Sequence, residues 1–130
     1  MRSEKRKIGD IGENIFAKHL VKHNYKILDR NYSKKWGEID IIAQKDNIIY
    51  FVEVKTVTRE NVKDLKKEVD GFQPEENVHP MKLRRMGRVI QTYLIEKDIE
   101  EVEWQFDVMA VFLDIENKQA RVRVTENVVI

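Results

Sequence analysis

Three carboxylates and a lysine interrupt two segments that would otherwise be ordinary apolar strands. Glu38 and Asp40 fall in the first segment, and Glu53 and Lys55 fall in the second, with the polar residues 44–47 between them. Two β-rich runs around a turn that contains Asp and Asn are typical of a β-hairpin. Such a hairpin would hold carboxylates, which can bind a divalent cation, beside a lysine, which supplies a positive charge.

A two-residue loop at 46–47 would fix the register of this hairpin; a four-residue loop keeps the same register, whereas a three-residue loop would break it. This register places Asp40 opposite Glu53, and Glu38 opposite Lys55. Because side chains alternate with period two, all four are expected on one face. Opposed Cβ atoms lie roughly 4.5–5.5 Å apart, and two carboxylates at that separation repel each other. A divalent cation between Asp40 and Glu53 is the simplest compensation, with the charge of Lys55 beside it.

A solvated sheet face is the alternative interpretation of the same residues, with a Glu38–Lys55 pair and nothing bound. Charged side chains on a strand are more often of this kind, whereas the opposition of Asp40 and Glu53 favours a metal site. From the hairpin alone, both interpretations stay open.

Length and composition indicate one domain. A chain of 130 residues is long enough for a single core, and a hydrophobic content of 42% is typical of a soluble globular protein. No apolar run approaches the length of a membrane span, and no apolar region follows the basic N-terminus as in a signal peptide. The lack of cysteine excludes disulfides and zinc–thiolate sites. We therefore expect a cytoplasmic protein with no membrane partner.

The charge pattern is more informative than the net charge of +1, which does not by itself indicate nucleic-acid binding. Basic residues gather before the hairpin and again at 82–88, whereas acids concentrate in the hairpin. Basic rims around an acidic centre suit an enzyme that acts on phosphodiesters, although charge runs are more often solvated faces. The candidate nucleic-acid contacts are Lys34, Lys35, Lys82, Arg84, Arg85 and Arg88.

Hydrophobic periodicity predicts the elements that position these residues. The expected elements are a helix over 3–23, a strand over 25–32, the hairpin over 36–56, a helix from Pro80 to about 97, and strands over 103–113 and 119–125. The helical crossover after the hairpin implies a parallel strand beyond it. We therefore expect an α/β fold with a mixed β-sheet flanked by helices, in the order α-β-β-β-α-β plus a C-terminal strand. The polar segment 57–79 is expected to be a mobile excursion of the single domain 1–130.

Other catalytic motifs are absent. The sequence has no phosphate-binding loop, no dinucleotide glycine fingerprint, no Gly-x-Ser-x-Gly and no cysteine nucleophile. His19 and His23 form a helical i, i+4 pair that we interpret as a surface pair. Glu13 lies at the edge of the apolar stripe of the first helix, either as a surface group, which is favoured, or as a carboxylate directed at the sheet.

The hairpin residues GEIDIIA at 37–43 and FVEVK at 51–55 resemble the PD-(D/E)xK phosphodiesterase pattern, in which Asp on one strand and Glu-x-Lys on the next surround magnesium. Ile39 stands where many of these nucleases have proline. With Gly12-Glu13 and QFDV at 105–108, nearly the whole chain resembles the YraN-like family of uncharacterised bacterial proteins. That family is regarded as restriction-endonuclease-like and similar to archaeal Holliday-junction resolvases.

The resemblance implies a restriction-endonuclease-like core and a catalytic set of Glu13, Asp40, Glu53 and Lys55. Asp40, Glu53, Glu13 and the Val54 carbonyl would bind Mg²⁺ or Mn²⁺, and Lys55 would orient or activate the attacking water. The implied activity is endonucleolytic hydrolysis of DNA, including branched DNA, and the implied assembly, by analogy alone, is a homodimer. The alternative function is a non-catalytic nucleic-acid-binding or adaptor protein that keeps the nuclease fold.

Overall fold

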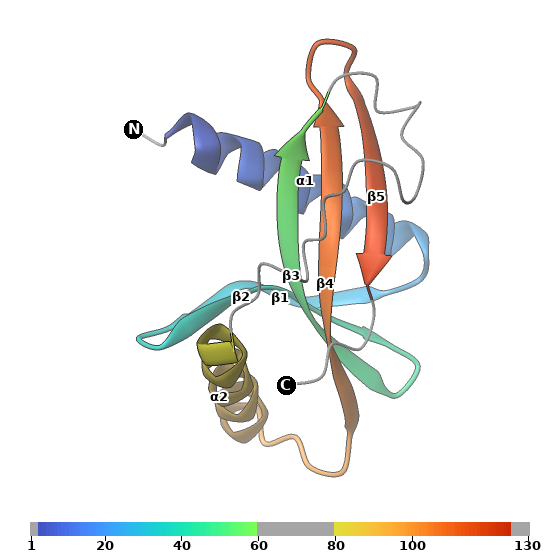
Figure 1. The fold of residues 1–130 in the computed structure, drawn as a ribbon. Helices are drawn as coiled ribbons and strands as arrows, with labels where there is room; N and C mark the ends of the chain where they lie inside the picture. Colours follow the sequence, from blue (N-terminus) through green and yellow to red (C-terminus); the bar gives the residue numbers. More distant parts are fainter. Residues whose placement is uncertain (1–2, 60–79, 126–130) are drawn as a thin grey trace.

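The computed structural model describes residues 3–59 and 80–125. The elements are α1 (Glu4–Lys22), β1 (Lys26–Lys34), β2 (Gly37–Lys45), β3 (Ile48–Thr58), α2 (Pro80–Glu96), β4 (Glu103–Asp114) and β5 (Gln119–Thr125). The strands form one sheet in the order β1-β2-β3-β4-β5 (Figure 1). β3 and β4 are parallel, and the other neighbouring strands are antiparallel. The predicted α/β class, element order and mixed sheet are therefore confirmed.

Local signals in the sequence explain where the helices begin and end. Ser3 caps α1, because its side-chain oxygen accepts a hydrogen bond from the Arg6 amide at 3.1 Å. Asn24 follows α1 with a φ of 70°, the left-handed conformation that Asn tolerates at a helix end. Pro80 is the first residue of α2, where its missing N–H is not needed.

The two helices cover opposite faces of the sheet. Figure 1 shows α1 crossing behind β3 and β4, with α2 beside β2. The α1 cluster consists of the buried residues Phe16, Ala17, Leu20, Ile41, Ala43, Val52, Met109, Val111 and Leu113. The α2 cluster consists of the buried residues Ile39, Ile42, Ile49, Phe51, Met86, Val89, Ile90, Tyr93, Leu94, Phe106 and Val108. Each large apolar side chain buried in this way stabilises the fold by roughly 1.5–3 kcal/mol.

The strand β3 is longer than the sequence predicted. It continues to Thr58 beside β4, and the Arg59 amide donates a hydrogen bond to the Leu113 carbonyl at 2.8 Å. Residues 57 and 58 therefore belong to the sheet and not to the predicted excursion, because β4 supplies hydrogen-bond partners along this length. The rest of that excursion, residues 60–79, lies outside the described residues. No helix in the described part of the chain is long and apolar enough to cross a membrane.

Candidate functional site

The turn of the β2–β3 hairpin has the predicted register. Lys45 pairs with Ile48 across a turn at 46–47, and the ladder continues regularly to the pair of Ile41 and Val52. Asp46 has a φ of 55°, as the tight two-residue turn requires.

The ladder ends at Ile41 and Val52, so Asp40 and Glu53 are not the directly opposed pair that the sequence predicted. The cause is a break in the alternation of β2. Ile39 packs in the α2 cluster and Ile41 packs in the α1 cluster, although residues two apart on a regular strand share a face. The regular alternation on which the one-face expectation depended therefore does not hold between Ile39 and Ile41.

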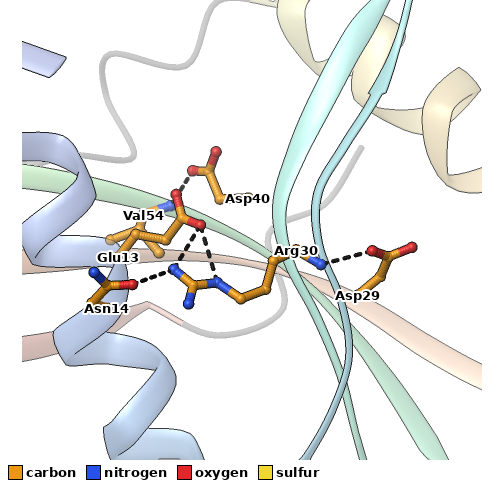
Figure 2. Close-up of polar contacts among 6 residues, drawn as sticks. All are labelled: Glu13, Asn14, Asp29, Arg30, Asp40 and Val54. Atoms are coloured by element: carbon orange, nitrogen blue, oxygen red, sulfur yellow. Dashed lines mark hydrogen bonds and ion pairs between the residues drawn. The ribbon is translucent and has the colours of Figure 1, made fainter. Parts of the chain in front are cut away.

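Beyond the pair of Ile41 and Val52, β2 separates from β3. The Asp40 side chain then replaces a backbone carbonyl as the hydrogen-bond acceptor of β3. The Val54 amide donates a hydrogen bond to Asp40 Oδ2 at 2.8 Å (Figure 2). Beyond this point Figure 1 shows the β1–β2 hairpin turning away while β3 continues beside β4. Asp40 thus sits at the opening between the two branches of the sheet.

A cavity of about 440 Å³ lies in this opening, on the side of α1. Ligand sites of small molecules have volumes of this order. Its lining residues are Arg6, Gly9, Asp10 and Glu13 of α1, Asn31 and Ser33 of β1, Glu38 and Asp40 of β2, and Val54 of β3. Lys55 lines a neighbouring cavity that shares Gly9 and Val54 with the first. The structure therefore brings Glu13, Asp40 and Val54 together, with Lys55 adjacent.

The Asp40 carboxyl group is in an environment that disfavours its charge. Burial raises the pKa of Asp40 to about 7, and the negative charges of Glu53, Glu13 and Glu38 act in the same direction. The hydrogen bond from Val54 opposes this shift only in part. A carboxyl group held among other carboxylates would be ionised more readily if a cation were bound beside it.

Glu53 is buried, and its two oxygens differ in their surroundings. Oε1 accepts a hydrogen bond from the Lys82 ammonium and lies 3.5 Å from Lys55 Nζ. Oε2 is buried without a hydrogen-bond partner among the described residues. A buried carboxylate oxygen without a donor is costly, so this oxygen can accept a further partner.

Glu13 is also buried, so the surface interpretation of this residue is wrong. Its Oε1 accepts hydrogen bonds from Arg30 Nε at 3.3 Å and Nη2 at 3.0 Å (Figure 2). The same Arg30 Nη2 donates to Asn14 at 2.7 Å. The predicted carboxylate on the first helix therefore does face the sheet, and its charge is compensated by an arginine on β1.

Asp40 and Glu53 have the right chemical groups to bind a divalent cation, but the arrangement of the described side chains fits one less well. The carboxylates of Asp40 and Glu53 are the hard oxygen donors that Mg²⁺ prefers, and Glu53 Oε2 has no hydrogen-bond partner among residues 3–59 and 80–125. Within residues 3–59 and 80–125, however, no three Asp, Glu or His side chains are placed to hold one metal ion. A cation at this position would thus be held by two carboxylates and a carbonyl, with water completing its coordination, as Mg²⁺ commonly retains several waters.

The predicted nucleic-acid contacts divide into two groups. Lys34 pairs with Glu96 at 2.8 Å, and the Arg88 guanidinium stacks 4.0 Å from the Trp36 ring centroid. Lys82 points into the carboxylate group instead of outward. The exposed members are Lys35, in the β1–β2 turn, and Arg84, Arg85 and Arg88, on α2. Gly37, the first residue of β2 after this turn, packs against α2 at Arg85 and Val89, so basic residues far apart in the sequence lie on one side of the molecule.

Comparison with known proteins identifies the relationship of the chain. The model of the Uncharacterised protein family UPF0102 matches residues 12–111. The chain belongs to this family. It is 38% identical over 112 residues to a UPF0102 protein of Flavobacterium johnsoniae, covering 84% of each chain. It is 34% identical over 123 residues to one of Caldicellulosiruptor saccharolyticus, covering 95% of this chain and 97% of that protein. The predicted membership of an uncharacterised family is confirmed, whereas the wider nuclease superfamily stays a prediction.

In this member of UPF0102, the structure adds residues to the site that the sequence did not single out. Asp10 lines the cavity one turn before Glu13 on α1, and its i, i+3 spacing was a signal that could have revealed it. Arg30 had no such signal. Its contact with Glu13 joins β1 to α1 across 17 positions of the chain and depends on how α1 packs on the sheet.

Proposed function

We propose that this UPF0102 protein is a metal-dependent endonuclease that hydrolyses phosphodiester bonds of DNA, with branched DNA among its substrates. The observation that carries the proposal is the gathering of Asp40, Glu53 and Lys55 where β2 and β3 separate. Asp40 is bonded to Val54 at 2.8 Å, and Lys55 lies 3.5 Å from Glu53. The hairpin motif resembles that of phosphodiesterases that use the same residue types.

Each residue of the site has a role that its surroundings support. Asp40 and Glu53, with the Val54 carbonyl, would hold Mg²⁺ or Mn²⁺, and Glu13 would hold the metal or a water from α1. When bound, the cation would polarise the phosphate and offset the charge that develops in the transition state. Lys55 is partly buried beside Glu53, where its ammonium can orient the attacking water and stabilise negative charge on the phosphate.

Cleavage of DNA tests this proposal directly. Incubation with linear and branched DNA in Mg²⁺ or Mn²⁺ is expected to give hydrolysis that falls about a hundredfold or more in Asp40→Asn and Lys55→Ala. The matched control is Lys45→Ala, which removes a lysine from the far end of the same hairpin and is expected to cleave normally. Circular dichroism would establish that all three variants are folded.

Two results would reject the catalytic proposal. The first is the lack of metal-dependent cleavage of every substrate by the native sequence. The second is cleavage that persists unchanged in Asp40→Asn and Lys55→Ala, because a contaminating nuclease would then be responsible.

A non-catalytic nucleic-acid-binding or adaptor function is the second candidate, and one observation favours it. Glu53 is already neutralised by Lys82 and Lys55, and in the described segments no three acidic or histidine side chains form a ready metal site. The basic side formed by Lys35, Arg84 and Arg85 would then be the functional surface. This candidate predicts DNA binding without hydrolysis.

Reversing the charge of Arg84, Arg85 and Arg88 to Glu is expected to weaken DNA binding and flatten its dependence on salt. Each phosphate contact that is lost removes about one unit from the slope of log affinity against log salt. Fluorescence anisotropy with labelled DNA at several salt concentrations measures both quantities. The control reverses three exposed lysines elsewhere, Lys18, Lys22 and Lys26, which changes the net charge equally. Equal losses in the two triple variants would show that only net charge matters.

A further inference from the structure

Lys82 lies apart from the arginines that follow it on α2. Its ammonium donates a hydrogen bond to Glu53 Oε1, and its charge also interacts with Asp40. This contact places an ammonium group directly against one of the two carboxylates to which we assign the metal.

Two ammonium groups already lie beside the proposed ligand Glu53 without any added ion. Asp40 and Glu53 supply two carboxylates, and Lys55 and Lys82 supply two ammonium groups. Lys55 Nζ lies farther from Glu53 Oε1, at 3.5 Å, and Lys82 makes the closer contact. A divalent cation that entered beside both ammonium groups would be repelled by them, since like charges at such distances disfavour each other.

Of the two lysines beside Glu53, Lys82 is the one whose ammonium group can move away from the carboxylate. The two side chains are similarly exposed, 36% for Lys82 and 32% for Lys55, but their places in the fold differ. Lys82 comes from the first turn of α2, whereas Lys55 belongs to β3, which is paired with β4 at this residue. A lysine stem is flexible and strongly favours a hydrated ammonium, so the side chain can turn into solvent without unfolding its helix. Glu53 is only 10% exposed and has no comparable freedom.

We propose that Lys82 is an internal competitor of the divalent metal, occupying the cation position at Glu53 until a metal displaces it. The inference rests on the proposed metal site at Asp40 and Glu53. It assigns Lys82 to the control of metal affinity, which is a different role from the phosphate contact predicted for it. The observed affinity for metal is then lower than the carboxylates alone would provide.

Calorimetric titration of Mn²⁺ into the metal-free full chain tests the competition without any cleavage assay. Lys82→Met and Lys82→Gln are expected to bind Mn²⁺ about tenfold more tightly than the native chain, because one competing positive charge is gone. Arg84→Met is the matched control, since it removes an exposed charge two residues away on the same helix. Asp40→Asn tests whether the heat of Mn²⁺ binding arises at the proposed site, because this variant is expected to lose it.

Each outcome decides the proposal. Tighter binding in both Lys82 variants, with Arg84→Met unchanged, supports it, and so does Mn²⁺ binding that is detected only after Lys82 is replaced. Unchanged or weaker binding in the Lys82 variants, while Asp40→Asn loses binding, overturns the competition and leaves the metal site intact. An equal gain in Arg84→Met also overturns it, because net charge would explain the effect. No Mn²⁺ binding in any variant overturns both the competition and the metal site.

Discussion

Asp40→Asn is expected to stabilise the metal-free protein by about 2–4 kcal/mol at pH 8. Burial raises the pKa of Asp40 to about 7 from its ordinary value of 3.8, so the folded protein holds this proton more tightly than the unfolded chain. Ionisation of Asp40 therefore does not change the free energy of unfolding below about pH 4. It lowers that free energy increasingly between pH 4 and 7, and by its full amount above pH 7. Asn stays neutral, and its oxygen can still accept the hydrogen bond from Val54.

Urea unfolding in EDTA at several pH values between 4 and 8 measures this effect. The gain in free energy of unfolding should grow with pH across that window and be close to zero at its acidic end. Asp114→Asn is the control, because Asp114 is buried but accepts hydrogen bonds from the amide and side chain of Asn117 at 3.1 and 2.7 Å. An Asp40→Asn protein that is no more stable than the native one at pH 8 would contradict the expectation.

Together with the cleavage assay, this measurement distinguishes a functional carboxylate from a structural one. Replacing a residue that is kept for stability should destabilise the protein. Replacing a functional residue often stabilises it, because functional groups are commonly held at a cost in stability. Greater stability and lost cleavage in the same Asp40→Asn protein would be the combination expected of a catalytic site. Greater stability with unaltered DNA binding and no cleavage by the native chain would favour the non-catalytic candidate.

Gly12→Ala is expected to destabilise the protein by about 3 kcal/mol, because α1 packs closely on β3 at this residue. A Cβ at Gly12 would lie 1.9 Å from Thr56 Oγ1 and 2.8 Å from Thr56 Cβ, so α1 or β3 would have to move. Such a movement would also displace the adjacent Glu13 from the site. Urea unfolding of the variant measures the loss of stability.

Gly9→Ala, one turn earlier, is the matched control. A Cβ at Gly9 meets nothing within 4 Å, so the change is expected to stabilise α1 by about 0.5–1 kcal/mol through helix propensity alone. Opposite signs for the two substitutions would support the close contact of α1 with β3. A Gly12→Ala protein as stable as Gly9→Ala would contradict it.

The sequence alone determined the elements of this protein and much of their pairing. The Ser3 cap, the left-handed Asn24 and Pro80 act over a few residues, so their effects can be predicted without tertiary contacts. The same holds for the turn at 46–47, which sets the β2–β3 register as far as the pair of Ile41 and Val52. A parallel pair of strands needs a crossover connection, usually helical, and the helix α2 between β3 and β4 predicted their parallel pairing.

Only the tertiary structure decided how the charged side chains meet. Ile39 and Ile41 pack against different helices, which breaks the alternation of β2 and turns Asp40 toward the Val54 amide. The docking of α2 brings Lys82 to Glu53 from 29 positions along the chain. Local patterns carry no information on such contacts, because they depend on which face of the sheet each helix covers and how closely it packs. The residue types of the site were therefore readable in the sequence, whereas their geometry was a consequence of packing.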